Sequence, residues 1–178
     1  MKKQIVIAAL ALGAFVLGTN TIHAQATAST TVNIILADVI SIDAGSAATN
    51  GTVAFNYASS ADYNTAKNQT IAESLIVTSS KNFDVKIKAE GSTFTNGTNF
   101  IPVDVLQVQA VTGGSIVGTF NTITLTTADQ ILVSNATKGA KKSLSIDYSI
   151  SAEKASTVLL GKAPGTYTQQ VTYTATAL

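Results

Sequence analysis

Apolar and polar residues alternate along most of this chain with a period of two. The clearest case is 83–89, where Phe, Val, Ile and Ala alternate with Asp and Lys. Alternation of this kind gives a strand one face for a core and one face for solvent. The segments are rich in Thr, Ser, Val and Ile, which favour strands. The pattern predicts an all-β protein.

Turn-forming residues separate the segments that we expect to be strands. Two of the expected strands, 71–78 and 83–89, are predicted to form a hairpin. In 101–111 the inward phase changes between Val105 and Leu106, which indicates a bulge or a crossing between sheets. The other expected strands are 30–37, 39–43, 51–57, one or two short strands within 116–125, 144–150 and 166–177. Short strands with no helix between them predict an immunoglobulin-like Greek-key β-sandwich.

The first residues have the three parts of a secretory signal peptide. Lys2 and Lys3 give a cationic start, an apolar run follows, and a polar stretch ends in a small-residue cleavage site at Ala24. The apolar run has 13 residues, whereas a membrane-spanning helix needs roughly 20. We therefore predict a signal peptide at 1–24 and an exported protein, with cleavage after Ala26 as the alternative.

The residue types that are missing restrict the chemistry. The chain has no Cys, Trp or Arg, and its one His, His23, lies in the predicted signal peptide. A mature chain without His or Cys cannot build ordinary zinc sites, Ser–His or Cys–His pairs, or the usual haem ligand sets. The 10 acidic residues are dispersed singly, with no calcium-loop spacing. We expect no enzymatic activity and no metal or other cofactor.

The net charge and the positions of the aromatic residues indicate which ligands the protein could bind. Because 11 basic residues nearly balance 10 acidic ones, no nucleic-acid surface is indicated. Most aromatic residues fall at inward positions of the alternating segments, and Tyr63, in a polar loop, is expected to be the most exposed. One alternative is therefore a monomeric exported β-sandwich that binds surface glycan, of host or other origin, or peptidoglycan.

The residues that follow the signal peptide form an N-terminal extension, 25–37, ahead of a domain at 38–178. The extension alternates, and no turn folds it back at once. It is either a plain edge strand or a strand donated to another molecule, pairing along an exposed sheet edge while its apolar side chains fill pockets. The candidate donor residues are Thr30, Val32, Ile34 and Leu36.

The order of these segments resembles the major pilin subunits of chaperone-usher fimbriae, especially the alternate (colonisation-factor) and archaic (spore-coat-U-like) groups. It is also similar to small exported β-sandwich proteins of Gram-negative bacteria. The segments that carry the resemblance are ASTTVNIILADVISIDAGS after the signal peptide, GTVAFNY, ESLIVTSSKNFDVKIKAEG, IPVDVLQVQAV and the ending APGTYTQQVTYTATAL.

The resemblance implies an incomplete sandwich without its final strand, completed by donor-strand exchange. A periplasmic chaperone would fill the groove first, and at the outer-membrane usher the N-terminal strand of the next subunit would replace it. The resemblance places the accepting groove along 166–177, with Tyr167, Val171, Tyr173 and Ala175 as acceptor residues. The chain departs from some of these pilins in having Ala37-Asp38-Val39 where they have a Pro, and from others in lacking a disulfide.

The expected function is that of a structural fimbrial subunit. It would pass through the periplasm, assemble by β-strand addition with its own copies or related subunits, and reach the cell surface or an extracellular fimbria. There it would support adhesion or biofilm formation.

Overall fold

The computed structural model describes residues 27–178, so the predicted signal peptide and both cleavage sites lie outside the described residues. The chain divides into two units between Leu36 and Ala37. In the first unit, 27–36 contains no strand, and the side chains of Val32, Ile34 and Leu36 are largely exposed. The strand expected at 30–37 is therefore wrong for the isolated chain, because a strand needs a hydrogen-bonded neighbour and the described segment pairs with none.

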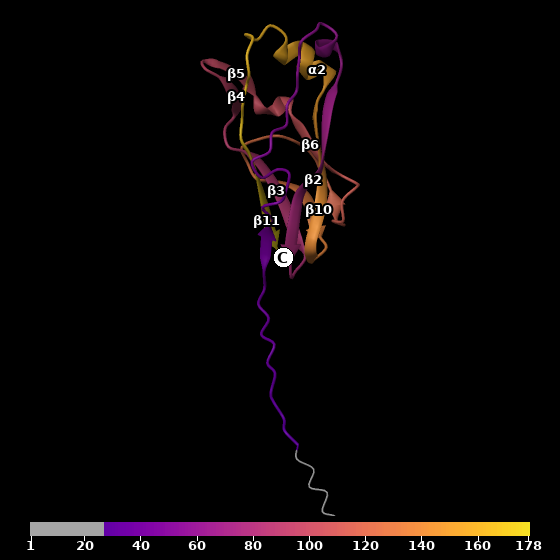
Figure 1. The fold of residues 1–178 in the computed structure, drawn as a ribbon. Helices are drawn as coiled ribbons and strands as arrows, with labels where there is room; N and C mark the ends of the chain where they lie inside the picture. Colours follow the sequence, from indigo (N-terminus) through magenta and orange to yellow (C-terminus); the bar gives the residue numbers. More distant parts are fainter. Residues whose placement is uncertain (1–26) are drawn as a thin grey trace, which may run out of the picture. The chain divides into compact units, whose positions relative to one another are not determined.

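The second unit, 37–178, is built from two antiparallel sheets that enclose an apolar core, and the predicted all-β sandwich is confirmed (Figure 1). The five-stranded sheet has the order β1 (Ile40–Ile42), β2 (Lys67–Ser79), β10 (Gly139–Ile150), β6 (Gln107–Val111) and β8 (Thr122–Thr124). The four-stranded sheet has the order β11 (Val171–Ala177), β3 (Phe83–Ala89), β9 (Gln130–Ala136) and β7 (Thr119–Phe120).

The core lies between the inward faces of the two sheets, as the alternation predicts. In β3 the side chains of Phe83, Val85 and Ile87 are fully buried, and Asp84 between them is not. The opposite sheet contributes further buried apolar residues, among them Leu75, Val77, Val108, Leu144 and Ile146. Removing these side chains from water supplies the main driving force for folding, since the chain has no disulfide.

The connection between β2 and β3 corrects one expectation. These strands do not form a hairpin: β2 pairs with β1 and β10, whereas β3 pairs with β11 and β9. The residues between them therefore cross from one sheet to the other. Each strand has one buried face in either arrangement, so alternation alone cannot separate a hairpin from a corner.

Residues 101–111 cross between sheets, as the change of phase indicated. The hairpin of β4 (Thr93–Asn96) and β5 (Asn99–Pro102) forms a small separate sheet. A 3₁₀ turn, η2 (Val103–Val105), then leads into β6 of the five-stranded sheet. The turn supplies the change of phase, because both Val105 and Leu106 are buried.

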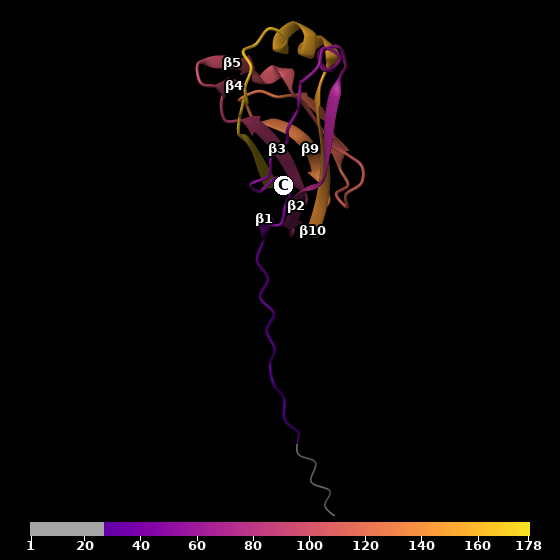
Figure 2. The same cartoon turned by 45° about the horizontal axis from the view of Figure 1, so that its top comes forward.

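Helical turns interrupt the strands where none was expected. A short helix, α2 (Ala152–Lys154), follows β10 and continues as the wider turn η3 (Ala155–Leu159). The hydroxyl of Ser151 accepts a hydrogen bond from the backbone N–H of Lys154, 3.2 Å away, and so caps the helix. A single 3₁₀ turn, η1 (Asp62–Asn64), lies at the same end of the sandwich (Figure 2).

Candidate functional site: an open groove beside the C-terminal strand

One long side of the sandwich is closed by the chain itself. The short strands expected within 116–125 are β7 and β8, and they belong to different sheets: β7 pairs with β9 and β8 pairs with β6. The chain crosses from one sheet to the other at Asn121. The backbone N–H and side-chain amide of Asn121 donate to the carbonyls of Leu132 (2.9 Å) and Ile131 (3.1 Å). A continuous run of backbone therefore joins the two sheets on this side.

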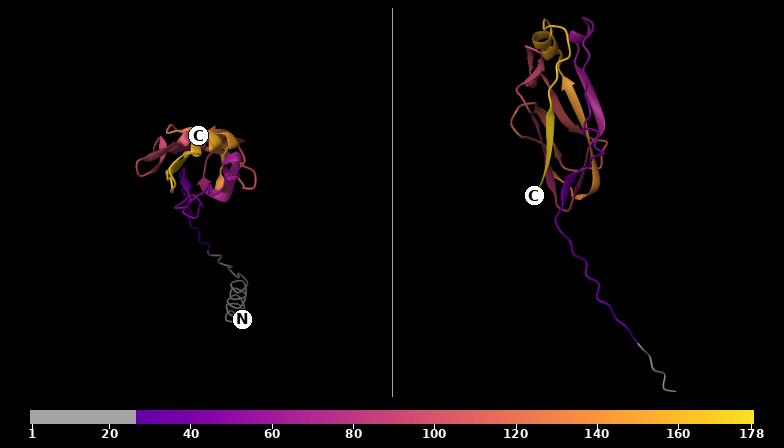
Figure 3. Two further views of the ribbon diagram at one scale, coloured as in Figure 1. Left: turned by 90° about the horizontal axis from the view of Figure 1, so that it is seen from above. Right: turned by 60° about the vertical axis from the view of Figure 1, so that its left-hand side comes forward.

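On the opposite side of the sandwich no strand of the described residues is shared between the sheets, although the edge strands β1 and β11 lie close to each other. The last strand, β11, pairs with β3 along one edge, and no strand in the described part of the chain pairs with its other edge. The strand expected at 166–177 is therefore shorter than predicted, since regular pairing begins at Val171. Figure 3 (right) shows β11 in yellow at the margin of its sheet. In the other sheet, the edge strand on this side is the three-residue β1.

A tight turn after β1 leads the chain out of the five-stranded sheet. The Ser46 hydroxyl donates to the carbonyl of Asp43 (2.7 Å) and accepts from the N–H of Ile76 (2.8 Å). The N–H of Ala48 donates to the carbonyl of Ser74 at 2.8 Å, beside Glu73, whose φ of 49° marks an irregularity in β2. These bonds fix the turn to β2 and determine where the following segment begins.

The segment 51–57 follows this turn and was expected to be a strand, but it has no strand partner among the described residues. Its side chains nevertheless alternate between exposed and partly buried, and Val53, Phe55 and Tyr57 pack against the core. The hydroxyl of Tyr57 is buried without a hydrogen-bond partner in residues 27–178. The segment thus has the side-chain arrangement of a strand without its backbone pairing.

A cluster of charged side chains binds the C-terminal end of the segment 51–57. Lys67 Nζ donates to the carbonyl of Asn56 at 2.5 Å, lies 5.0 Å from the centre of the Tyr57 ring and pairs with Asp62 at 2.7 Å. Asp62 also accepts from the N–H groups of Ala58 (2.9 Å) and Ser59 (2.7 Å). The hydrogen bond from Lys67, followed by those from Ser59, lowers the pKa of Asp62 well below its usual value.

The aromatic residues differ from expectation at one position. Tyr63 was expected to be the most exposed, but its ring is partly buried, 5.2 Å from that of Tyr57. Burial explains the difference, because η1 folds the polar loop back onto the domain. Among residues 27–178 the exposed aromatic side chain is Phe100 of β5, at 53% exposure.

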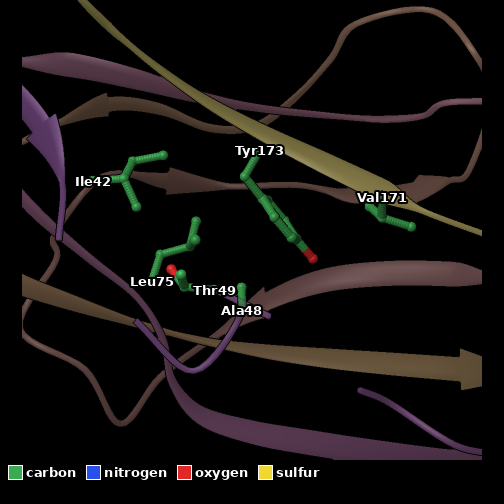
Figure 4. Close-up of a pocket in the computed structure, with 6 residues that line it drawn as sticks. All are labelled: Ile42, Ala48, Thr49, Leu75, Val171 and Tyr173. Carbon is green, nitrogen blue, oxygen red and sulfur yellow. The ribbon is translucent and has the colours of Figure 1, made fainter. Parts of the chain in front are cut away.

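A cavity of about 140 Å³ opens on the unclosed side of the sandwich (Figure 4). Its lining comes from three parts of the chain that are distant in sequence: β1 with its turn, β2 and β11. The residues are Ile42, Ala48, Thr49, Leu75, Val171 and Tyr173. We call this cavity, together with the free edge of β11 and the segment 51–57, the groove.

Two tyrosines connect the sheets beside the cavity. Tyr173 of β11 points inward, and its hydroxyl meets the hydroxyl of Tyr148 on β10 in the other sheet. Burial, and then the proximity of Tyr148, raises the pKa of Tyr173 well above its usual value. The pair is a polar contact inside an otherwise apolar region, with each hydroxyl as the partner of the other.

The predicted acceptor residues are only partly brought together. Val171 and Tyr173 line the cavity; Tyr167 and Ala175 pack against the core without lining it, and Tyr167 precedes β11. The predicted donor residues lie in the unpaired segment described above. Four lining residues were not predicted, namely Ile42, Ala48, Thr49 and Leu75. Ile42 and Leu75 belong to expected strands, but nothing in the sequence marks Ala48 or Thr49.

Two other kinds of site were sought among the described residues. Within residues 27–178 there is no cluster of three or more His, Cys, Asp or Glu side chains that could hold a metal ion. The same residues contain no helix of sufficient length and apolarity to cross a membrane. No protein-family model matches this chain, and no curated protein matches it either. The groove is therefore the feature from which a function has to be argued.

Proposed function

We propose that this protein is a pilin-like structural subunit that assembles by β-strand addition. In this proposal the domain is an incomplete immunoglobulin-like sandwich, and its groove accepts the N-terminal strand of another copy or of a related subunit. A periplasmic chaperone and an outer-membrane usher would handle the subunit during export, and the assembled fimbria would support adhesion or biofilm formation at the cell surface.

The observation that carries the proposal is the free edge of β11 beside the cavity, since no strand in the described part of the chain pairs with that edge. The segment 51–57 also has no strand partner there, and its side chains are half-buried against the core. In this proposal the added strand pairs with the edge of β11 and supplies 51–57 with a neighbour. An unpaired edge beside apolar surface is prone to aggregation unless it is covered, and an added strand covers it.

The N-terminal segment of the chain has properties that suit it as the added strand. Val32, Ile34 and Leu36 alternate along one face and are 77%, 81% and 87% exposed. Exposed aliphatic side chains are costly in water, and those that share one face of a strand can fill apolar space beside a sheet edge. Ile35, at 92% exposure, would fall on the other face of such a strand. The donor residues span seven positions, 30–36, which equals the seven residues of β11.

Deletion of residues 25–37 tests the proposal. The mature chain should form multimers by size-exclusion chromatography with light scattering, whereas the deletion variant should stay monomeric. A synthetic peptide of residues 27–37 should bind the deletion variant and raise its unfolding midpoint, because a ligand that binds only the folded state stabilises it. A peptide carrying Ile34→Asp is the matched control and should bind much more weakly, since a charge would replace an apolar side chain on the face that turns toward the domain.

A stable monomer of the mature chain that keeps its own N-terminal strand tightly paired would contradict the proposal. Failure of the deletion variant to bind the unaltered peptide would contradict it as well. Backbone amide exchange of 51–57 and 171–177 separates the outcomes, because these amides should become protected only when an added strand pairs with them.

A further inference from the structure

The Tyr148–Tyr173 contact lies beside the cavity that an added strand would fill. The two residues come from β10 and β11, which belong to opposite sheets, so the contact spans the interior on the open side of the sandwich. Tyr148 is buried, at 6% exposure, and Tyr173 also forms part of the cavity wall. The pair is therefore both a link between the sheets and a boundary of the groove.

The ring of Tyr173 subdivides the groove. In Figure 4 it extends from β11 between Ile42 and Leu75 on one side and Val171 on the other. Its far end is held by the hydroxyl of Tyr148. Moving the ring aside would break this contact and leave two buried hydroxyls without partners, which is unfavourable. The Tyr173 ring therefore keeps its position in the groove and does not move to fit whichever donor side chain is inserted.

The cavity has room for one side chain of moderate size. Its volume of about 140 Å³ is close to that of a known apolar cavity of about 150 Å³ that binds benzene. Four of its six lining residues are aliphatic, and polar atoms also contribute to its surface. Of the donor residues, Val32, Ile34 and Leu36 are apolar and each would fit by size and chemistry.

Backbone pairing alone would not determine which of these three donor residues occupies the cavity. A slip of two residues along a sheet edge restores the same hydrogen-bonding pattern and the same inward face, so it exchanges one inward side chain for the next. The fixed Tyr173 ring opposes such slips, because it forms part of the cavity wall and a slip would drive an inward side chain against it.

We propose that the Tyr148–Tyr173 pair fixes the register of the inserted strand, so that one residue of the N-terminal segment of a second copy occupies the cavity. This inference rests on the strand-addition function proposed above. Tyr173 is then a positioning residue of the groove, and Tyr148 acts through it.

Disulfide trapping in the full mature chain tests the register, and the natural chain has no Cys to interfere. Thr49 is exposed at the cavity, so Thr49→Cys is combined in turn with Val32→Cys, Ile34→Cys and Leu36→Cys. After mild oxidation, covalent multimers on a non-reducing gel report which donor position lies at the cavity. We expect one of the three double variants to give most of the product, and Tyr173→Leu added to each to spread the product over at least two.

Two further variants keep the test decisive. Tyr148→Phe removes only the hydroxyl contact and should weaken the preference, which provides a second measurement if the Tyr173→Leu chains do not fold. Thr174→Leu is the matched control on β11, because Thr174 is exposed, and it should keep the preference.

The outcomes distinguish the register proposal from the function on which it rests. An unchanged single preference in both tyrosine variants overturns the register proposal, as does a mixture of products when both tyrosines are intact; in either case strand addition stands. Absence of covalent multimers from all three double variants overturns strand addition, and the register proposal with it.

Discussion

Gly51 lies against the backbone carbonyl of Ala47 so closely that a Cβ at position 51 would be 2.0 Å from that oxygen. No side chain can be accommodated there without moving backbone, because real Cβ contacts are not so short. This contact between Ala47 and Gly51 lies at the end of the turn after β1, where the segment 51–57 begins. We predict that Gly51→Ala destabilises the domain by about 1–3 kcal/mol, measured by urea unfolding, and weakens binding of the 27–37 peptide.

The matched control for this variant is Gly45→Ala in the same turn. A Cβ at Gly45 would be 3.2 Å from a side-chain oxygen of Asp43, and a side chain can yield where a backbone carbonyl cannot. Gly45→Ala should therefore cost less than Gly51→Ala. Equal losses in the two variants would show that the close approach at Ala47 does not determine the path of 51–57.

The Tyr148–Tyr173 contact predicts a loss of stability at alkaline pH. Because burial raises the pKa of Tyr173 above its unfolded value near 10, the folded state favours the protonated phenol. The stabilisation is fully present below pH 10 and is lost as the pH rises through the higher folded-state pKa. Urea midpoints between pH 8 and pH 12 should show this decline in the natural chain.

The variant Tyr173→Phe isolates this contribution. It should be less stable than the natural chain at pH 8 by about 1–3 kcal/mol, because the buried Tyr148 hydroxyl loses its partner. Its alkaline decline should also be smaller, since one perturbed phenol is gone. An identical decline in both proteins would assign the alkaline sensitivity to other groups.

Filling the cavity should lower the affinity for the donor peptide without lowering the stability of the unliganded domain. Ala48 is partly buried at the cavity wall, so Ala48→Val adds apolar volume to open space without removing a contact. We predict that the unliganded domain becomes as stable as the natural one or slightly more so, while its affinity for the 27–37 peptide falls. Isothermal titration calorimetry and urea unfolding measure the two effects. Undiminished binding by Ala48→Val would mean that the peptide does not use this cavity.

Much of the sandwich could be predicted from the sequence because its signal is local. The alternation of Phe83, Val85 and Ile87 with polar residues requires one buried face, and the structure buries that face. Which sheet each strand joins is a different question, because it depends on partners remote in sequence. The same local pattern accommodates both the hairpin that was expected between β2 and β3 and the corner that the structure has.

The residues of the groove could likewise be predicted only where the sequence signal is local. Val171 and Tyr173 could be expected from alternation together with the resemblance, because both lie on the inward face of the last strand. Ala48 and Thr49 could not, since they reach the cavity through a turn whose course depends on bonds from Ser46 and Ala48 to β2. Strand pairing at 51–57 was likewise overpredicted: its composition favours a strand, but pairing requires a neighbour.

The ion pair between Asp62 and Lys67 gives a prediction that direct titration can check. Because hydrogen bonds to Lys67 and then Ser59 lower the pKa of Asp62, its carboxylate should titrate well below the usual value of 3.8 in an NMR titration of its side-chain carboxyl carbon. In Lys67→Met the largest cause is removed, so the midpoint should rise toward 3.8 while the Ala58 and Ser59 contacts keep it from reaching that value.

The sign of the linked effect on stability follows from the lowered pKa. The contribution of Asp62 is present above its unfolded pKa near 3.9 and is lost as the pH falls through the lower folded-state value. Lys154→Met, which breaks the separate pair with Asp104, is the matched control and should leave the Asp62 midpoint unchanged. If Lys67→Met also left that midpoint unchanged, Lys67 would not be what holds the carboxylate ionised, and its link to the end of 51–57 would have to rest on the Asn56 carbonyl and the Tyr57 ring.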